Sequence, residues 1–129
     1  MILDTSAILA ILKSEPEASR FSDALSGAER IAIAAPTLVE LGMVAESRAG
    51  ETVRPRIDRL LQSMKVEVVP FTADHAAVAL DGWRRYGKGR HPAGLNLGDC
   101  FAYALAKARG EPLLFKGDDF ARTDVKAAI

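Results

Sequence analysis

The chain has 129 residues, which is enough for one domain with a sizeable hydrophobic core. Hydrophobic residues make up 49% of it, and this excludes an intrinsically disordered chain. Lysine and arginine number 17, as do aspartate and glutamate, so the formal net charge is zero. That balance argues against attachment to nucleic acid or membrane through overall charge, but it leaves room for a local basic groove beside an acidic site.

The single cysteine, Cys100, excludes an internal disulfide and a Cys-x-x-Cys metal site. A reducing compartment is therefore expected. The apolar start of the chain is interrupted by Asp4 and has no basic leader, so no signal peptide is expected. No segment approaches the roughly 20 apolar residues that span a bilayer. We expect one soluble, cytoplasmic domain over residues 1–129.

In the first half of the chain, short apolar segments alternate with helical ones. Residues 1–3 are expected to form a central, buried strand, because this segment is so short and so close to the terminus. Residues 31–34 form the next strand, which Pro36 ends. Apolar residues at helical spacing predict four helices, at residues 5–12, 16–26, 37–49 and 53–64.

The second half continues the alternation. The segment 87–94 contains several glycines and a proline and is expected to be the longest loop. The other expected elements are strands at 66–69 and 112–115, helices at 72–86 and 96–108, and a short helix at 120–124. Right-handed crossovers between such strands give a three-layer α/β/α sandwich with a short central parallel sheet.

Acidic residues stand at the edges of the apolar segments. They are Asp4, Glu40, Asp99 and the adjacent pair Asp118 and Asp119. In open parallel sheets, ligands bind at the carboxyl ends of the strands, so these positions are expected to converge there. Because a cluster of carboxylates repels itself, a bound cation would stabilise it. Ligands that are all oxygen favour Mg²⁺ or Mn²⁺ over zinc.

Each acidic residue also has a structural interpretation. Thr37 and Glu40 have the spacing of a capping box, and so do Asn96 and Asp99. Asp4 could cap the helix that follows it, and the Asp118–Asp119 pair could form an ordinary turn. Any one of them alone would be interpreted as structural, whereas their joint occurrence at one edge of the fold favours a metal site.

The remaining candidates are weaker. A local basic patch, consisting of Arg84, Arg85, Lys88, Arg90 and His91, is either a solvated surface or a contact for a phosphate backbone. Trp83 and Tyr86 could stack on a base, but packing is the preferred interpretation of Trp83. His75 and His91 lack metal-ligand spacing, and Cys100 is expected in the core.

These motifs together resemble the PIN-domain ribonucleases, and within them the VapC-type toxins of prokaryotic toxin–antitoxin pairs. The resemblance is carried by residues 1–7, by Glu40, by residues 113–120, and most specifically by residues 91–106. It runs over nearly the whole chain. It implies a Mg²⁺-dependent endoribonuclease that is silenced by a cognate VapB-like antitoxin and forms a homodimer with both sites in one groove.

The resemblance also assigns roles. Asp4, Glu40 and Asp99 would form the acidic core, with Asp119 or, alternatively, Asp118 as the fourth acid. Thr5 or Ser6 would bind a metal-held water or a substrate phosphate.

Three rival interpretations remain. A haloacid dehalogenase-type phosphatase also begins with an aspartate after the first strand, but it needs a second acid where this chain has Ser6. A two-component receiver needs an aspartate after a later strand, and the 66–69 strand has none. The non-enzyme alternative is a binding module of the same fold, whose acidic groove receives basic side chains of a partner.

Overall fold

The computed structural model describes residues 1–129 and has a four-stranded sheet at its centre. The strands are β1 (Ile2–Leu3), β2 (Ala32–Ala34), β3 (Glu67–Val69) and β4 (Leu113–Leu114). Their order is β3-β2-β1-β4, and every neighbouring pair is parallel. The prediction that the first strand is central and buried is therefore confirmed.

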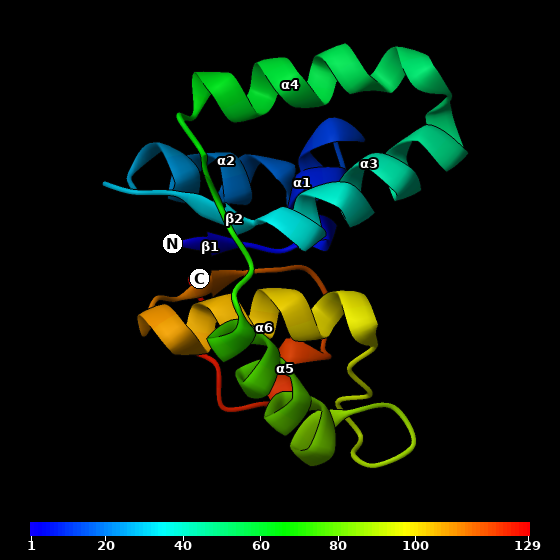
Figure 1. The fold of residues 1–129 in the computed structure, drawn as a ribbon. Coiled ribbons are helices and arrows are strands. Elements are labelled where there is room, and N and C mark those ends of the chain that lie inside the picture. The colour runs from blue at the N-terminus through cyan, green and yellow to red at the C-terminus, as the bar shows by residue number, and fades with distance from the viewer.

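Helices cover both faces of the sheet. Figure 1 shows α1 to α4 on one side and α5 and α6 on the other, which is the predicted α/β/α sandwich. The helices are α1 (Thr5–Leu12), α2 (Ala18–Ser26), α3 (Ala35–Ala49), α4 (Arg54–Ser63), α5 (Ala73–Tyr86) and α6 (Leu97–Arg109), with 3₁₀ turns η1 (Glu51–Val53) and η2 (Phe120–Arg122). No helix is both long and apolar enough to cross a membrane.

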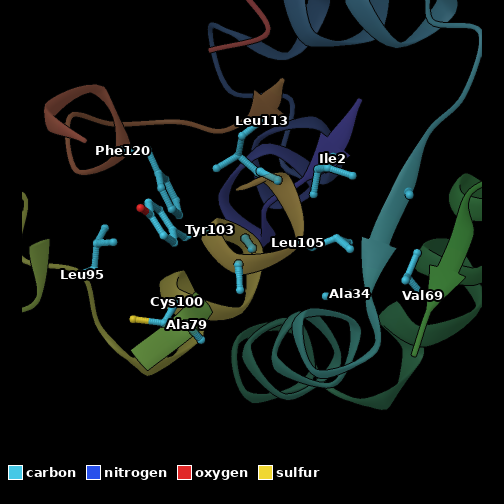
Figure 2. Packing of buried hydrophobic residues seen from close by; sticks show 14 of the residues in the cluster. Ile2, Ala34, Val69, Ala79, Leu95, Cys100, Tyr103, Leu105, Leu113 and Phe120 are labelled. Atoms are coloured by element: carbon cyan, nitrogen blue, oxygen red, sulfur yellow. The ribbon is translucent and has the colours of Figure 1, made fainter. Parts of the chain in front are cut away.

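Two apolar cores form because successive strand residues point to opposite faces. Ile2 packs in the cluster with α5 and α6, whereas Leu3 packs in the cluster with α1 to α4. Figure 2 shows part of the first cluster, with Cys100, Tyr103 and Leu105 of α6 inside it. The expected core position of Cys100 is confirmed, and burial raises the pKa of its thiol to about 11.

The helix boundaries differ from the expected ones mainly where prolines occur. α3 begins at Ala35 rather than residue 37, because Pro36 fits the first turn of a helix, where its missing N–H is not needed. The same applies to Pro55 in the first turn of α4. The expected 53–64 helix is observed as α4, which begins one residue later, directly after the 3₁₀ turn η1, and the helix expected from residue 16 begins at Ala18.

Asp124 attaches the C-terminal segment to α5 and α6. Its carboxylate accepts hydrogen bonds from the Tyr103 hydroxyl at 2.8 Å, from Arg85 Nη1 at 3.2 Å and from Lys107 Nζ at 3.1 Å. Burial raises the pKa of the Tyr103 phenol, and the bond to Asp124 raises it further. Gly82 of α5 makes room for this ring, because a Cβ there would come within 2.5 Å of Tyr103 Cδ1.

Candidate metal centre

Asp4 lies directly after β1 at the carboxyl edge of the sheet and caps α1. Its Oδ2 accepts hydrogen bonds from the backbone N–H of Ser6 at 2.9 Å and from the Ser6 hydroxyl. The backbone is fixed as well, since Asp4 N donates to Leu114 O at 3.0 Å and Lys116 N donates to Ser6 Oγ at 2.9 Å. Asp4 is only 4% exposed, and this burial raises its pKa even though the bonds from Ser6 oppose the shift. The structural capping role is therefore real, and the carboxylate is also costly to ionise.

Glu40 projects from α3 toward α1. Its Oε2 accepts a hydrogen bond from Thr5 Oγ1 at 2.9 Å. Partial burial raises the pKa of Glu40, while the bond from Thr5 opposes that effect. The capping box considered for Thr37 and Glu40 is absent: α3 has no side-chain cap, and the fully buried Thr37 hydroxyl has no hydrogen-bond partner. Because the helix starts two residues earlier than expected, Glu40 is free for another role.

Asp99 lies in the first turn of α6 and does form a capping box. Asn96 Oδ1 accepts from Asp99 N at 2.9 Å, and Asp99 Oδ2 accepts from Asn96 N at 2.8 Å. Burial raises the pKa of Asp99 to about 6, and the charges of Asp4, Asp119 and Glu40 add to the shift. Like Asp4, Asp99 combines a capping role with a place among other carboxylates.

Asp4, Glu40 and Asp99 line one groove of about 400 Å³. No lysine or arginine forms an ion pair with any of the three. The hydrogen bonds that position each carboxylate go to one of its oxygens, so the other oxygen is available. Uncompensated carboxylates with available oxygens fit a hard divalent cation.

The fourth acid is less closely associated with the groove. Asp118 and Asp119 are both exposed, and neither lines it. The charge of Asp119 nevertheless contributes to the raised pKa values of Asp4 and Asp99, after the larger effect of burial. No group of three Asp, Glu, His or Cys side chains is already close enough to hold a metal ion. A site of one or two carboxylates, in which waters complete the coordination, is the arrangement that Mg²⁺ commonly takes in proteins.

Gly98 brings α6 close to Glu40. A Cβ at this position would overlap the Glu40 carboxylate, so only glycine lets that carboxylate lie over the first turn of α6. Sequence reasoning did not single out this glycine. The signal that could have found it is its place between Asn96 and Asp99, the two residues of the capping box.

The basic patch lies outside the carboxylate groove, since none of its members lines it. Arg85 is held by Asp124, and the Arg90 guanidinium lies over the Trp83 ring at 4.2 Å, so one face of that ring is covered. Both histidines bind local backbone: His75 Nδ1 accepts from Thr72 N, and His91 Nδ1 accepts from Ala93 N.

Sequence reasoning also missed the cations that line the groove, which are Lys13, Arg48 and Lys116. Lys116 Nζ bonds to Glu15 at 2.7 Å and to Glu17 at 3.1 Å. The helical spacing of Lys13 from Thr5 and of Arg48 from Glu40 is the signal that could have revealed two of them.

Comparison with known proteins agrees with this architecture. The family model described as PIN domain matches residues 1–126, a range that contains every acidic candidate. The Ribonuclease VapC of Mycolicibacterium smegmatis is 47% identical over 127 residues, covering 98% of this chain and 98% of the relative. The chain belongs to the PIN-domain family and is of the VapC type.

Solved structures support the same fold for this VapC-type chain. VapC20 of Mycobacterium tuberculosis, described as a sarcin-ricin loop cleaving toxin, superposes with a TM-score of 0.76 at 17% identity and covers 96% of this chain and 95% of its own. A toxin–antitoxin complex from Klebsiella pneumoniae gives 0.69 at 19% identity, with coverages of 95% and 92%. At such identities the likeness concerns the fold alone.

Proposed function

We propose that this VapC-type protein is an endoribonuclease that depends on Mg²⁺, with Mn²⁺ as a possible substitute, and that a cognate VapB-like antitoxin inhibits it. The observation that carries the proposal is the groove in which Asp4, Glu40 and Asp99 meet while none of them forms an ion pair with a lysine or arginine. Asp4 and Asp99 would hold the cation, and Asp119 is the preferred fourth acid over Asp118. The relatives named ribonuclease support the substrate class.

The chain's own residues position the reaction. When bound, the cation would lower the pKa of a water and orient it for in-line attack on a phosphodiester. Thr5 holds one oxygen of Glu40. Because burial raises its pKa, the Glu40 carboxylate is suited to accept a proton at Oε1, the oxygen that Thr5 does not hold. The two hydroxyls considered for metal-held water or phosphate already bond within the site, Thr5 to Glu40 and Ser6 to Asp4.

We also propose a homodimer. Exposed apolar side chains gather on helices beside the site: Val39 and Met43 on α3, Leu80 on α5 and Leu97 on α6. Met43 is 68% exposed and Leu97 is 74% exposed, which is unfavourable in a lone monomer. An apolar groove of about 520 Å³ adjoins Leu80 and Leu97. A second copy packed on this face would bury it.

The unpaired carboxylates of the groove also support inhibition by an antitoxin. An arginine of the antitoxin that entered the groove would pair with these carboxylates and compete with the cation. The Klebsiella pneumoniae neighbour, itself a toxin–antitoxin complex, supports this kind of partner.

The test is cleavage of total RNA by partner-free protein, with Mg²⁺, with EDTA, and with Asp4→Asn or Asp99→Asn in Mg²⁺. Discrete fragments that require both the metal and the intact acids would support the nuclease. Folded protein that binds Mg²⁺ but leaves total RNA intact would instead favour the non-catalytic acidic-groove module.

A further inference from the structure

The carboxylate groove extends well beyond the carboxylates, along the facing sides of two helices. α1 and α3 each contribute residues spaced by four, which places them along one helix face. From the acidic end outward, α1 and its C-cap contribute Thr5, Leu9 and Lys13, and α3 contributes Glu40, Val44 and Arg48. Along these two helices the lining changes from polar and acidic to apolar and then to basic, and Glu15, which also lines the groove, pairs with Lys13 and Lys116. Eight helical residues span about 12 Å, so its two ends are about that far apart.

Among the basic residues of the groove, Arg48 is the one that remains free. Lys116 is fixed between two glutamates, and Lys13 pairs with Glu15 at 3.6 Å. Arg48 forms no ion pair and no side-chain hydrogen bond, and it is exposed. An unpaired guanidinium is a strong ligand for phosphate, because its fork of N–H groups binds two oxygens at once.

We propose that the groove between α1 and α3 is a subsite for the nucleotide next to the bond that is cut. Arg48 binds a phosphate of that neighbouring nucleotide, and Lys13 supports it electrostatically. Leu9 and Val44 contact the ribose or base between this phosphate and the carboxylates. The inference rests on the proposed nuclease function and extends it, since it assigns substrate binding to residues distinct from the acidic site.

The apolar middle of the groove favours a nucleotide over a free anion. Leu9 and Val44 are the only apolar residues that line it, and they lie between the acidic and the basic end. Single-stranded nucleic acid binds where cations track its backbone and apolar or aromatic surface meets its bases. A groove that bound only phosphate would gain nothing from aliphatic side chains at this point.

The first experiment measures binding separately from cleavage. Fluorescence anisotropy of a labelled 12-nucleotide single-stranded RNA of mixed sequence is followed in EDTA over a range of salt concentrations. Arg48→Ala is expected to weaken binding about tenfold and to reduce the slope of log affinity against log salt by about one, as loss of a phosphate contact does. Arg48→Lys should restore part of the affinity, because it keeps the charge but not the fork.

The matched control is Arg59→Ala, which removes an exposed arginine of α4 that does not line the groove. Its affinity should stay within twofold of the parent protein. Arg84→Ala tests whether the basic patch is the phosphate path instead. The proposal would be overturned if Arg48→Ala bound the RNA as tightly as the parent protein does. It would also be overturned if only Arg84→Ala, and not Arg48→Ala, lost about tenfold in RNA affinity.

Cleavage in Mg²⁺ separates the subsite from the nuclease itself. Arg48→Ala should raise KM with kcat within twofold, because a contact with the flanking nucleotide is made in both the ground state and the transition state. If the parent protein cleaves RNA and Arg48→Ala has the same KM and affinity, the subsite proposal is rejected and the nuclease function stands. If the parent protein does not cleave RNA but Arg48→Ala still weakens RNA binding, the nuclease function is rejected and the RNA-binding subsite stands.

Discussion

The carboxylate of Glu40 occupies the space that a Cβ on Gly98 would fill, so α3 and α6 meet at the candidate metal centre through a side chain lying against bare backbone. This contact and the hydrogen bond from Thr5 to Oε2 together set the position of the Glu40 carboxylate. The position of the Glu40 side chain thus depends on one hydrogen bond and on the absence of a Cβ at Gly98.

Gly98→Ala is expected to reduce RNA cleavage at least tenfold while changing the melting temperature by no more than about 4 °C. The Glu40 carboxylate is the end of a flexible side chain, so it moves aside at small cost in stability but loses its position. The matched control is Gly42→Ala in α3, where a Cβ would lie 4.0 Å from Arg54 Nη1. That change should keep the activity and add up to about 1 kcal/mol of stability. Full cleavage by Gly98→Ala would contradict the positioning role.

Asp99→Asn is expected to stabilise the metal-free protein at neutral pH. Folding raises the pKa of Asp99 to about 6, so the folded state favours the protonated acid. The ionised Asp99 therefore destabilises the folded state by its full amount above a pH of about 6. This destabilisation decreases as the pH falls and is absent below the pKa that Asp99 has in the unfolded chain. After allowance for solvent screening of a partly exposed group, the gain is about 1 kcal/mol.

Thermal melts of both proteins in EDTA between pH 7.5 and pH 4 would measure this effect. The melting temperature of Asp99→Asn should exceed that of the parent protein by about 3–5 °C at pH 7.5, and the gap should close toward pH 4. Asparagine keeps an oxygen for the Asn96 N–H, so the helix cap is retained. A difference in melting temperature that increases at low pH would contradict a raised pKa for Asp99.

Mg²⁺ should stabilise the parent protein and fail to stabilise Asp4→Asn. A ligand at ten times its Kd adds about 1.4 kcal/mol, or about 4 °C for a chain of this size. Melts with a series of Mg²⁺ concentrations, followed by EDTA, would measure it. Asp23→Asn is the control, because Asp23 is exposed on α2, away from the groove. An equal rise in Asp4→Asn would place the cation elsewhere.

Met43→Glu or Leu80→Glu should convert the proposed dimer to a monomer, because a charge would enter the buried apolar face. Size-exclusion chromatography with light scattering should give twice the chain mass of 13.8 kDa for the parent protein and once that mass for the variants. Ile129→Glu, at an exposed apolar residue of the C-terminus, is the control and should remain dimeric. A monomeric parent protein at micromolar concentration would refute the interface.

Thr37→Val should stabilise the fold by about 1 kcal/mol. The Thr37 hydroxyl is fully buried without a hydrogen-bond partner, and valine has nearly the same shape without that desolvation cost. Urea unfolding would measure the difference, and Thr37→Ser, which keeps the hydroxyl but removes a methyl group, should lose stability. Destabilisation by valine would mean that the hydroxyl is satisfied by a buried water.

Much of this architecture could be predicted from the sequence because hydrophobic spacing and strand ends determine it. Asp4 follows a short apolar segment that predicts a buried strand, and Asp99 lies three residues after Asn96, which is the spacing of a capping box. The Thr37–Glu40 spacing was ambiguous, because the sequence motif of a cap does not show where Pro36 allows the helix to begin. Local sequence gives only weak signals for Gly98 and Arg48, namely a place inside a capping box and helical spacing from Glu40, because their roles depend on how α3 packs against α6 and α1.

Asp4 is synthesised long before the segment that fixes it, because its backbone is bonded to Leu114, and Ser6 is bonded to Lys116, 110 residues further along the chain. The central strand β1 cannot gain its second neighbour until β4 has left the ribosome. A nascent chain therefore carries its acidic residues without the framework that aligns them. The order of synthesis therefore delays assembly of the groove until β4 and Lys116 have been made, even though Asp4 and Glu40 precede them by many residues.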